Sequence, residues 1–375
     1  MNTGYQNLLK KITKTLSNLP GWRTSRKIVV IESDDWGSIR MSSNESYNAL
    51  QKAGLSLDKG AGARYNKYET LASKEDLQHL FEVLKSVKDK NGSSAKMTAV
   101  SLVANPDFKK IKEDNFQNYY YEPFTKTLRR YGKHGAFALW QQGIKENIFI
   151  PEFHGREHLN IQAWLRALQH GDKEVLLAFE HGIWGYNRNK GIGFQAAFDL
   201  EFASDLEQQR QIVKEGLVLF EKLHGYQANF FVPPNGPINN ELEKTAAENG
   251  IKFMSTPKIQ QEVLGEGRTK RHFRYLGKKN KHNQLYITRN AFFEPSGSRK
   301  DEVAICLKQI EMAFKYKKPA IISSHRVNFI GGLNEENKTK SLDHFSNLLK
   351  KIVKTWPEVE FMTSSELGET IQSKK

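Results

Sequence analysis

Ile28-Val29-Val30-Ile31 is a short apolar run, and it leads within a few residues to the paired acids Asp34-Asp35. Consecutive apolar residues of this kind are typical of a strand buried on both faces of a parallel sheet. Far downstream come His154-Gly155-Arg156-Glu157-His158 and then a separate His325. One carboxylate and two histidines form a ligand set for a first-row metal ion, and the remaining Asp and His are natural acid–base partners beside it. The sequence therefore predicts a metal-dependent hydrolase.

Predicted strands and helices alternate along most of the chain. We expect strands at 27–31, 98–103, 148–153, 228–232, 285–288, 320–323 and 360–362, and helices at 74–90, 161–168, 206–223, 240–249, 301–314 and 341–355. This alternation predicts an α/β fold with mainly parallel strands. The candidate chemical residues all follow strands, and the carboxyl ends of parallel strands in a barrel lie at one rim. We therefore expect these residues to meet there.

Composition restricts the class of protein. The 375 residues include 57 Lys and Arg against 42 Asp and Glu, a net charge of +15, and 38% of them are hydrophobic. The apolar fraction is enough for a sizeable core, and the dispersed positive charge is typical of a solvated face, so no nucleic-acid partner is expected. A single cysteine, Cys306, excludes an internal disulfide framework and a cysteine-based zinc site. No stretch approaches the roughly 20 apolar residues of a membrane span, and no segment reads as a signal peptide, so we expect a cytoplasmic protein with no obligate protein partner.

The histidine and aspartate motifs each have a plain structural interpretation as well. Histidines at i and i+4 share one face of a helical turn, and such pairs are as often core or surface residues as metal ligands. Gly155 between the two histidines and the strand before them favour the metal. Asp34 and Asp35 have helix capping or a turn as their alternative role. In the functional interpretation, one of the two carboxylates binds the metal and the other stays free as a base.

In order and placement these motifs resemble the polysaccharide deacetylase family, also called the NodB-homology family or carbohydrate esterase family four. That family carries Thr-Phe-Asp-Asp-Gly, His-Ser/Thr-x-x-His, Arg-x-Pro-x-Gly and Leu-x-His motifs in this order. Their counterparts here are Glu32-Ser33-Asp34-Asp35-Trp36-Gly37, His154-Gly155-Arg156-Glu157-His158, Val232-Pro233-Pro234-Asn235-Gly236 and Ser323-Ser324-His325.

The resemblance implies a distorted (β/α) barrel of about seven strands. Residues 1–26 would be a lead-in and residues 27–370 a single domain, with inserted loops near 38–62, 106–148 and 181–199. It also implies that Asp35, His154 and His158 bind one divalent metal ion, with Asp34 as catalytic base and His325 as catalytic acid. Zinc suits this ligand set best, and cobalt, nickel, manganese and iron are compatible with it. The implied substrate is an N- or O-acetylated carbohydrate, such as a polysaccharide or a glycan precursor.

Two departures from the family pattern matter for the chemistry. Val232 stands where the family has an arginine that pairs with the base, and Arg289 and Arg326 are the candidates to replace it. A further motif of the family, which contains a tryptophan, has no evident counterpart. We expect its neighbourhood at residues 289–293.

Further residues are expected to bind the substrate. A backbone N–H near Asn235, in the turn with Pro234, would help to hold an oxyanion, and Arg326 lies next to the predicted acid. Long aromatic loops at a barrel rim either shape a ligand cleft or only pack the loops down. In the first case, flat apolar faces for sugar rings would come from Trp36, Trp184, Tyr186 and Phe194. The basic surface would suit a phosphate- or uronate-bearing glycan.

Two other functions remain open. His154-x-x-Glu157-His158 also fits the inverted zinc-peptidase motif, in which Glu157 is the general base and the pair lies within a helix. Pro151 just upstream and the strand-like run before His154 argue against that helix. The other alternative is a non-catalytic glycan- or anion-binding protein on the same scaffold, which would use the positive charge.

Overall fold

The computed structural model describes residues 20–60, 62–186, 191–297 and 301–373. Most of the predicted lead-in (1–19), together with residue 61 and residues 187–190 of two predicted insertions, lies outside the described residues. One large sheet contains β1 (Lys27–Trp36), β2 (Met97–Leu102), β5 (Phe149–Gly155), β6 (Phe230–Phe231), β7 (Phe253–Ser255), β10 (Leu285–Ile287), β11 (Ala291–Phe292), β12 (Ala320–His325) and β13 (Val359–Met362). Its order is β10-β7-β6-β5-β2-β1-β12-β11, and β13 pairs with the first half of β1.

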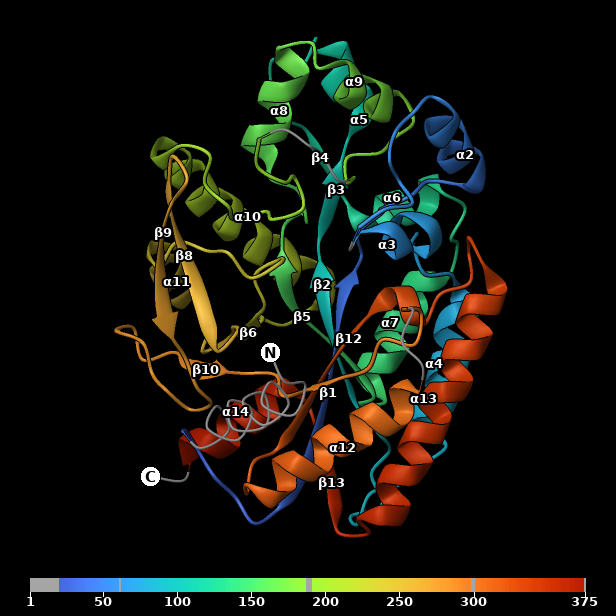
Figure 1. Cartoon of the computed structure of the whole chain (residues 1–375), viewed down its shortest axis with the longest axis vertical. Helices are drawn as coiled ribbons and strands as arrows, with labels where there is room; N and C mark the ends of the chain where they lie inside the picture. Colours follow the sequence, from blue (N-terminus) through green and yellow to red (C-terminus); the bar gives the residue numbers. More distant parts are fainter. Residues whose placement is uncertain (1–19, 61, 187–190, 298–300, 374–375) are drawn as a thin grey trace, which may run out of the picture.

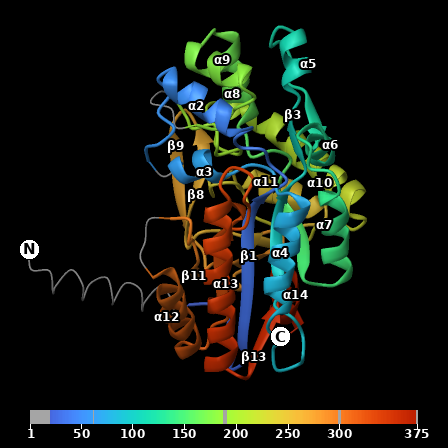
Figure 2. The ribbon, with the colours of Figure 1, turned by 90° about the vertical axis from the view of Figure 1, so that its right-hand side faces the viewer.

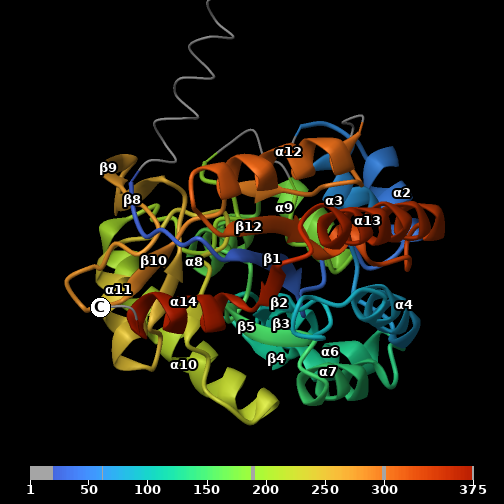
Figure 3. The same cartoon turned by 90° about the horizontal axis from the view of Figure 1, so that it is seen from below.

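Helices surround this sheet, as Figure 3 shows in a view from below. They are α2 (Asn44–Lys52), α3 (Ala63–Tyr68), α4 (Lys74–Lys85), α5 (Phe108–Glu113), α6 (Phe124–Arg130), α7 (Ala136–Lys145), α8 (Ile161–Gln169), α9 (Lys173–Glu180), α10 (Leu206–His224), α11 (Glu241–Glu248), α12 (Glu302–Lys315), α13 (Glu335–Thr355) and α14 (Ser364–Ser373), with short 3₁₀ turns at Ala203–Asp205 and Arg326–Asn328. The pairings recorded within the sheet are parallel, so its carboxyl ends face one way. This curled parallel half-barrel confirms the predicted fold class.

Strand β1 lies in the middle of the sheet, between β2 and β12 (Figure 1). Its apolar run is buried on both faces, with Ile28, Val29 and Val30 at 0% exposure. Val29 and Ile31 pack into one core cluster and Ile28 and Val30 into another, the alternation expected of a strand. The central place of β1 brings its carboxyl end, with Asp34 and Asp35, to the middle of the rim.

The predicted insertions are partly helical. Segment 38–62 contains α2, and segment 106–148 contains α5, α6, α7 and the strand β4 (Tyr121–Pro123), which pairs with β3 (Ala104–Pro106). Helix α7 belongs to the wall of the barrel, because its Trp140 packs against Phe149 of β5 with ring centroids 5.4 Å apart. Figure 2 shows α2, α5, α8 and α9 gathered beyond the carboxyl end of β1, so these segments build up the molecule above the rim.

One supersecondary unit was not predicted from the sequence. Strands β8 (Ile259–Gly265) and β9 (Arg268–Phe273) form an antiparallel hairpin beside the main sheet (Figure 1). Strand β9 is mostly exposed and charged, so it carries no apolar alternation that would mark it as a strand. None of the helices within the described ranges has the length and apolar character needed to cross a membrane.

Candidate active site

The two adjacent acids leave β1 in different directions. Asp34 stands directly opposite His325 in the parallel register of β1 and β12. Beyond Ser33 the register between β1 and β2 shifts, and Asp35 adopts a positive φ of 74°. This left-handed conformation is uncommon for a residue other than glycine and is typical of a bulge next to a functional site. The irregularity directs the Asp35 carboxylate to the histidines and leaves Asp34 facing other partners.

Asp35, His154 and His158 form one buried group. Asp35 Oδ1 lies 3.4 Å from His154 Nε2 and 3.2 Å from His158 Nε2, and one ligand atom from each residue lies within 4.8 Å of the others. Burial alone would raise the pKa of Asp35, but the two adjacent imidazoles, His154 and His158, hold its pKa well below the usual value. The carboxylate therefore stays ionised, as a metal ligand must.

His154 is held in the form that a metal requires. Its Nδ1 lies 2.6 Å from the backbone oxygen of Val232, an acceptor, so Nδ1 carries the proton and donates it. The lone pair of His154 then lies on Nε2, which is buried and has no hydrogen-bond partner among the described residues. An orphaned ring nitrogen beside a carboxylate and a second imidazole fits a divalent cation, and the Val232 carbonyl plays the orienting role usual for a ligating histidine. The three residues could therefore bind a metal ion.

Asp34 forms an ion pair with Arg289, which lies in the segment between β10 and β11. Nη1 and Nη2 of Arg289 each lie 2.6 Å from an oxygen of Asp34, and Nε donates to Glu32 at 2.5 Å. Burial would raise the pKa of Asp34, but the charge and hydrogen bonds of Arg289 lower it. Arg289, which follows β10, therefore makes the contact with Asp34 that was expected of an arginine at the position of Val232.

Arg326, the other candidate for that role, points away from the site. It is fully buried, donates from Nη1 to the backbone oxygen of Ser38 at 2.5 Å, and lies 3.3 Å from Glu69. It does not line the cavity, so the expectation that Arg326 contacts the substrate is wrong. Its side chain instead ties the end of β12 to the segment after β1.

His325 is coupled to a carboxylate that sequence reasoning missed. Its Nδ1 lies 2.5 Å from Glu294, and its Nε2 lies 3.9 Å from Asp34 Oδ2. Glu294 also accepts from Arg64 at 2.7 Å and from Asn328 at 3.0 Å. Burial alone would lower the pKa of His325, yet Glu294 raises it to about 9. Glu294 comes directly after residues 289–293, the neighbourhood in which the tryptophan-containing motif was expected.

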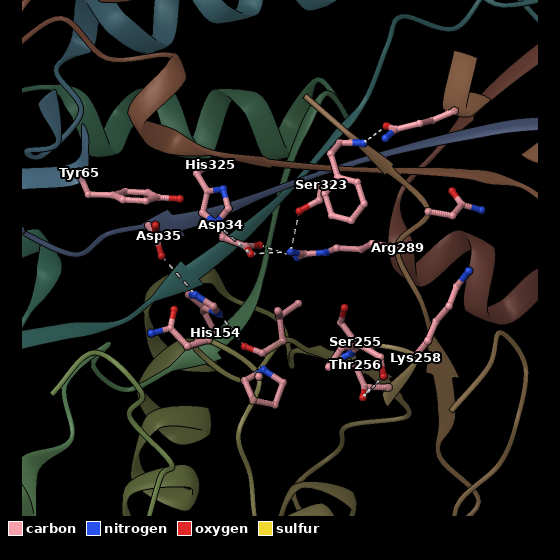
Figure 4. A pocket seen from close by; sticks show the side chains of 18 of the residues that line it. Asp34, Asp35, Tyr65, His154, Ser255, Thr256, Lys258, Arg289, Ser323 and His325 are labelled. Atoms are coloured by element: carbon pink, nitrogen blue, oxygen red, sulfur yellow. Dashed lines mark hydrogen bonds and ion pairs between the residues drawn. The ribbon is translucent and has the colours of Figure 1, made fainter. Parts of the chain in front are cut away.

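These groups share one large cavity. It has a volume of about 1310 Å³ and is lined by Asp34, Asp35, His154, His158 and His325, together with Arg289, Asn235 and residues of α3, α12 and the segment after β7. Figure 4 shows Asp34 and Asp35 of β1, His154 of β5, His325 of β12 and Arg289 from the segment after β10 converging, with Ser255, Thr256 and Lys258 across the cavity. The residues lie at the carboxyl ends of parallel strands, as expected of a barrel-type site.

The four aromatic side chains expected to hold sugar rings are buried, so that expectation is wrong. Trp36 is 1% exposed and packs edge-on against Phe149 with centroids 4.8 Å apart. Trp184 is also 1% exposed; its Nε1 donates to the Ile39 oxygen at 3.0 Å and its ring stacks on His158 at 6.1 Å. Tyr186 and Phe194 are buried too. Trp184 thus packs against His158, a candidate metal-binding residue, and has no exposed face to contact a sugar.

Other aromatic side chains line the cavity in their place. Phe292 is 43% exposed, and Tyr65 packs edge-on against His325 with centroids 5.4 Å apart. Asn235 is on the cavity lining, in a turn closed by a 3.1 Å bond from the N–H of Gly236 to the Pro233 oxygen. Pro234 is buried and is not part of the lining, so a direct contact of its side chain with substrate is not supported.

Glu157 does not face the candidate metal group. Its carboxylate accepts hydrogen bonds from Arg156 Nε at 2.8 and 2.9 Å, and it is not part of the cavity lining. His154 belongs to strand β5 and not to a helix. The arrangement required by the inverted peptidase motif, with two histidines and a glutamate around one helix, is therefore absent from this described part of the chain.

Comparisons with known proteins find matches among solved structures alone. No protein-family model and no curated protein matches the chain. A structure from Mycobacterium smegmatis described as a polysaccharide deacetylase matches with 11% identity, 94% coverage of this chain, 93% of that chain and a TM-score of 0.46. One from Pseudomonas aeruginosa PAO1, described in the same way, matches with 9% identity, 93% and 92% coverage and a TM-score of 0.47. BA3943, a CE4 family pseudoenzyme from Bacillus anthracis, matches with 11% identity, 79% and 61% coverage and a TM-score of 0.35. The similarity to these structures is at low identity.

Proposed function

We propose that this protein is a metal-dependent hydrolase that removes N- or O-acetyl groups from a carbohydrate. The observation that carries the proposal is the convergence of the buried Asp35, His154 and His158 group with Asp34 and His325 in one cavity. A ligand set, a carboxylate held ionised and a histidine with a raised pKa are the three parts that hydrolysis of an acyl group needs.

Asp35, His154 and His158 would hold one divalent ion, with zinc as the preferred ion and cobalt, nickel, manganese or iron as alternatives. When bound, such an ion polarises the acyl carbonyl and lowers the pKa of water. Two imidazoles and one carboxylate leave coordination positions open, which distinguishes a catalytic site from a closed structural one.

Asp34 is the proposed base. Its carboxylate takes the proton of the attacking water, while Arg289 keeps it oriented through two hydrogen bonds. His325 is the proposed acid and donates from Nε2 to the leaving nitrogen or oxygen, while Glu294 holds Nδ1. Asp34 Oδ2 and His325 Nε2 lie 3.9 Å apart, so one tetrahedral centre can contact both groups. A backbone N–H near Asn235 is the proposed further donor to the oxyanion.

The size and lining of the cavity support a carbohydrate with more than one sugar unit. Its volume of about 1310 Å³ exceeds the roughly 300–1,000 Å³ of typical small-molecule sites. Phe292 offers an exposed aromatic face, and sugar rings bind such faces through their C–H groups. In this proposal residues 27–370 act as one domain, because the site draws on strands from β1 to β12.

Acetate release tests the proposal. Purified protein is offered acetylated nucleotide-sugars, lipid-linked sugars, oligosaccharides and peptides, each with and without a chelator, alongside Asp34→Asn. Release that the chelator abolishes and that Asp34→Asn lacks would support the assignment. Cleavage of peptides alone would favour a peptidase. Metal content without chelator-sensitive release from any member would favour a binding protein.

A further inference from the structure

Arg40 is a buried cation to which the described residues give no polar partner. It is 5% exposed, lines the cavity, and its Nε is buried with no hydrogen-bond partner among those residues. The described residues give Arg40 no hydrogen bond and no ion pair. Arginine has five N–H donors, and a buried guanidinium normally engages carboxylates or backbone oxygens. An unsatisfied guanidinium in an enzyme cavity points to a ligand that supplies the acceptors.

The surroundings of Arg40 place it beside the candidate metal group. Its Cζ lies 5.7 Å from the ring of Trp184, and the same ring stacks on His158. On its other side Cζ lies 5.5 Å from the ring of Tyr65, which contacts His325. Gly185 gives the side chain its space, because a Cβ there would lie 3.3 Å from Arg40 Nε. Arg40 therefore contacts two aromatic rings, one of which stacks on His158 while the other packs against His325.

Contacts with the two rings do not provide hydrogen-bond acceptors for the N–H groups of Arg40. Cation–π attraction acts on the face of the guanidinium, whereas its N–H donors lie in the plane and still need acceptors. The neighbouring acid, Glu69, is 3.3 Å from Arg326 and so already serves another buried arginine. Glu69 is therefore engaged by Arg326, and Arg40 forms no ion pair with it among the described residues.

We propose that Arg40 binds an anionic group of the substrate, a carboxylate or a phosphate close to the acyl group that is removed. The inference rests on the proposed function for its account of the acyl group. The planar fork of an arginine matches the paired oxygens of a carboxylate or a phosphate, and a water-poor cavity strengthens that contact. Arg40 is then a specificity residue, which selects acidic over neutral acetylated sugars.

Calorimetric binding separates this inference from the question of catalysis. The probes are N-acetylglucosamine, its 6-phosphate and its 6-carboxylate, titrated into zinc-loaded wild type, Arg40→Met and Arg129→Met. Arg129 is exposed and is not part of the cavity lining, so its variant makes the same charge change elsewhere. Wild type and Arg129→Met should bind an acidic probe roughly ten- to hundredfold more tightly than the neutral sugar. In Arg40→Met that preference should disappear.

The comparison of the two acidic probes identifies the anion. Preference for the 6-carboxylate indicates a uronate, and preference for the 6-phosphate indicates a phosphorylated sugar. Equal binding of acidic and neutral probes to wild type, no binding of any probe, or a preference that survives in Arg40→Met would overturn the proposal. Failure of acetate release with intact Arg40-dependent binding would instead count against the proposed reaction alone.

Thermal melting distinguishes ligand binding from a structural role. Because Arg40 has no protein acceptor, Arg40→Met should melt no lower than wild type without a probe, and only wild type should melt higher when the acidic probe is added. A large fall in the melting temperature of Arg40→Met would show that Arg40 is structural and would overturn the inference. Arg40→Lys, which keeps the charge but loses the fork, should retain part of the acidic preference.

Discussion

Arg289 binds Asp34 through both of its terminal nitrogens, each 2.6 Å from a different carboxylate oxygen. The same guanidinium donates from Nε to Glu32, two residues earlier on β1. One arginine thus fixes the carboxylate that we propose as base and neutralises a second buried acid beneath it. The role is filled from the segment after β10, although the motif places its arginine at Val232, after β6.

Arg289→Lys should make Asp34 a less effective base while keeping a positive charge beside it. A lysine keeps the positive charge but makes no bidentate contact, so the pKa of Asp34 should rise towards its usual value. Asp34 acts as a base only when ionised, so the acid limb of the pH–rate profile should move to higher pH. We expect kcat to fall about 10- to 100-fold, measured by acetate release across pH.

Arg129→Lys serves as the control for Arg289→Lys and should leave the profile unchanged. If the acid limb of Arg289→Lys coincides with that of wild type, Arg289 does not set the pKa of Asp34.

Glu294→Gln should move the basic limb of the same profile. Glu294 raises the pKa of His325 to about 9, against the lowering effect of burial. His325 donates only when protonated, so wild-type activity should fall as pH rises through about 9. Without the carboxylate, the limb should shift towards the ordinary histidine value of about 6.5 or lower.

The free energy of unfolding should also depend on the protonation of His325. The raised pKa of His325 stabilises the fold below about pH 6.5, and this contribution is lost as pH rises through about 9. In Glu294→Gln that dependence should disappear from the free energy of unfolding. Glu82→Gln, a change at an exposed acid outside the cavity lining, is the matched control.

Asp35→Asn should fold normally, bind the metal more weakly and gain less stability from it. Asparagine tolerates the positive φ at this position better than most residues, so the backbone is preserved. Loss of the anionic ligand should lower the affinity for zinc at least about tenfold. At a free zinc concentration of about 1,000 Kd, wild type should gain about 4 kcal/mol in stability. Melting with and without zinc measures this gain, and an equal gain in Asp35→Asn would argue against Asp35 as a ligand.

Phe292 and Trp184 should respond differently to substitution. Phe292→Ala removes an exposed face from the cavity, so we expect a higher KM for oligosaccharides and a stability change within about 1 kcal/mol. Trp184→Phe removes the donor to the Ile39 oxygen in a buried place, which should cost roughly 1–3 kcal/mol. Melting curves and steady-state kinetics on both variants check this contrast. A KM effect in Trp184→Phe alone would return the sugar-binding role to Trp184.

The sequence allowed the fold class and the central residues to be predicted, because both depend on local patterns. The apolar run of β1 and the strand before His154 place Asp34, Asp35 and His154 at strand ends, and parallel strands bring such ends together. The partners of these residues could not be predicted in this way. Glu294 meets His325 at a sequence separation that no spacing rule covers. Arg289 was one of two candidates for the partner of Asp34, and nothing in the sequence favoured it over Arg326. The aromatic residues were wrongly expected to be exposed, because residue type alone does not reveal which way a side chain points. Trp36 at the end of β1 and Trp184 in its loop both point into the core.

The direct register between Asp34 on β1 and His325 on β12 has a consequence for engineering. Their separation is set by backbone hydrogen bonds between adjacent central strands, so it should not change when the loops above the rim are exchanged. Segment 38–62, which carries Arg40, and the segment after β7, which carries Lys258, both border the cavity. Grafting different loops at these two places should alter which glycan is accepted while the acid and the base keep their spacing.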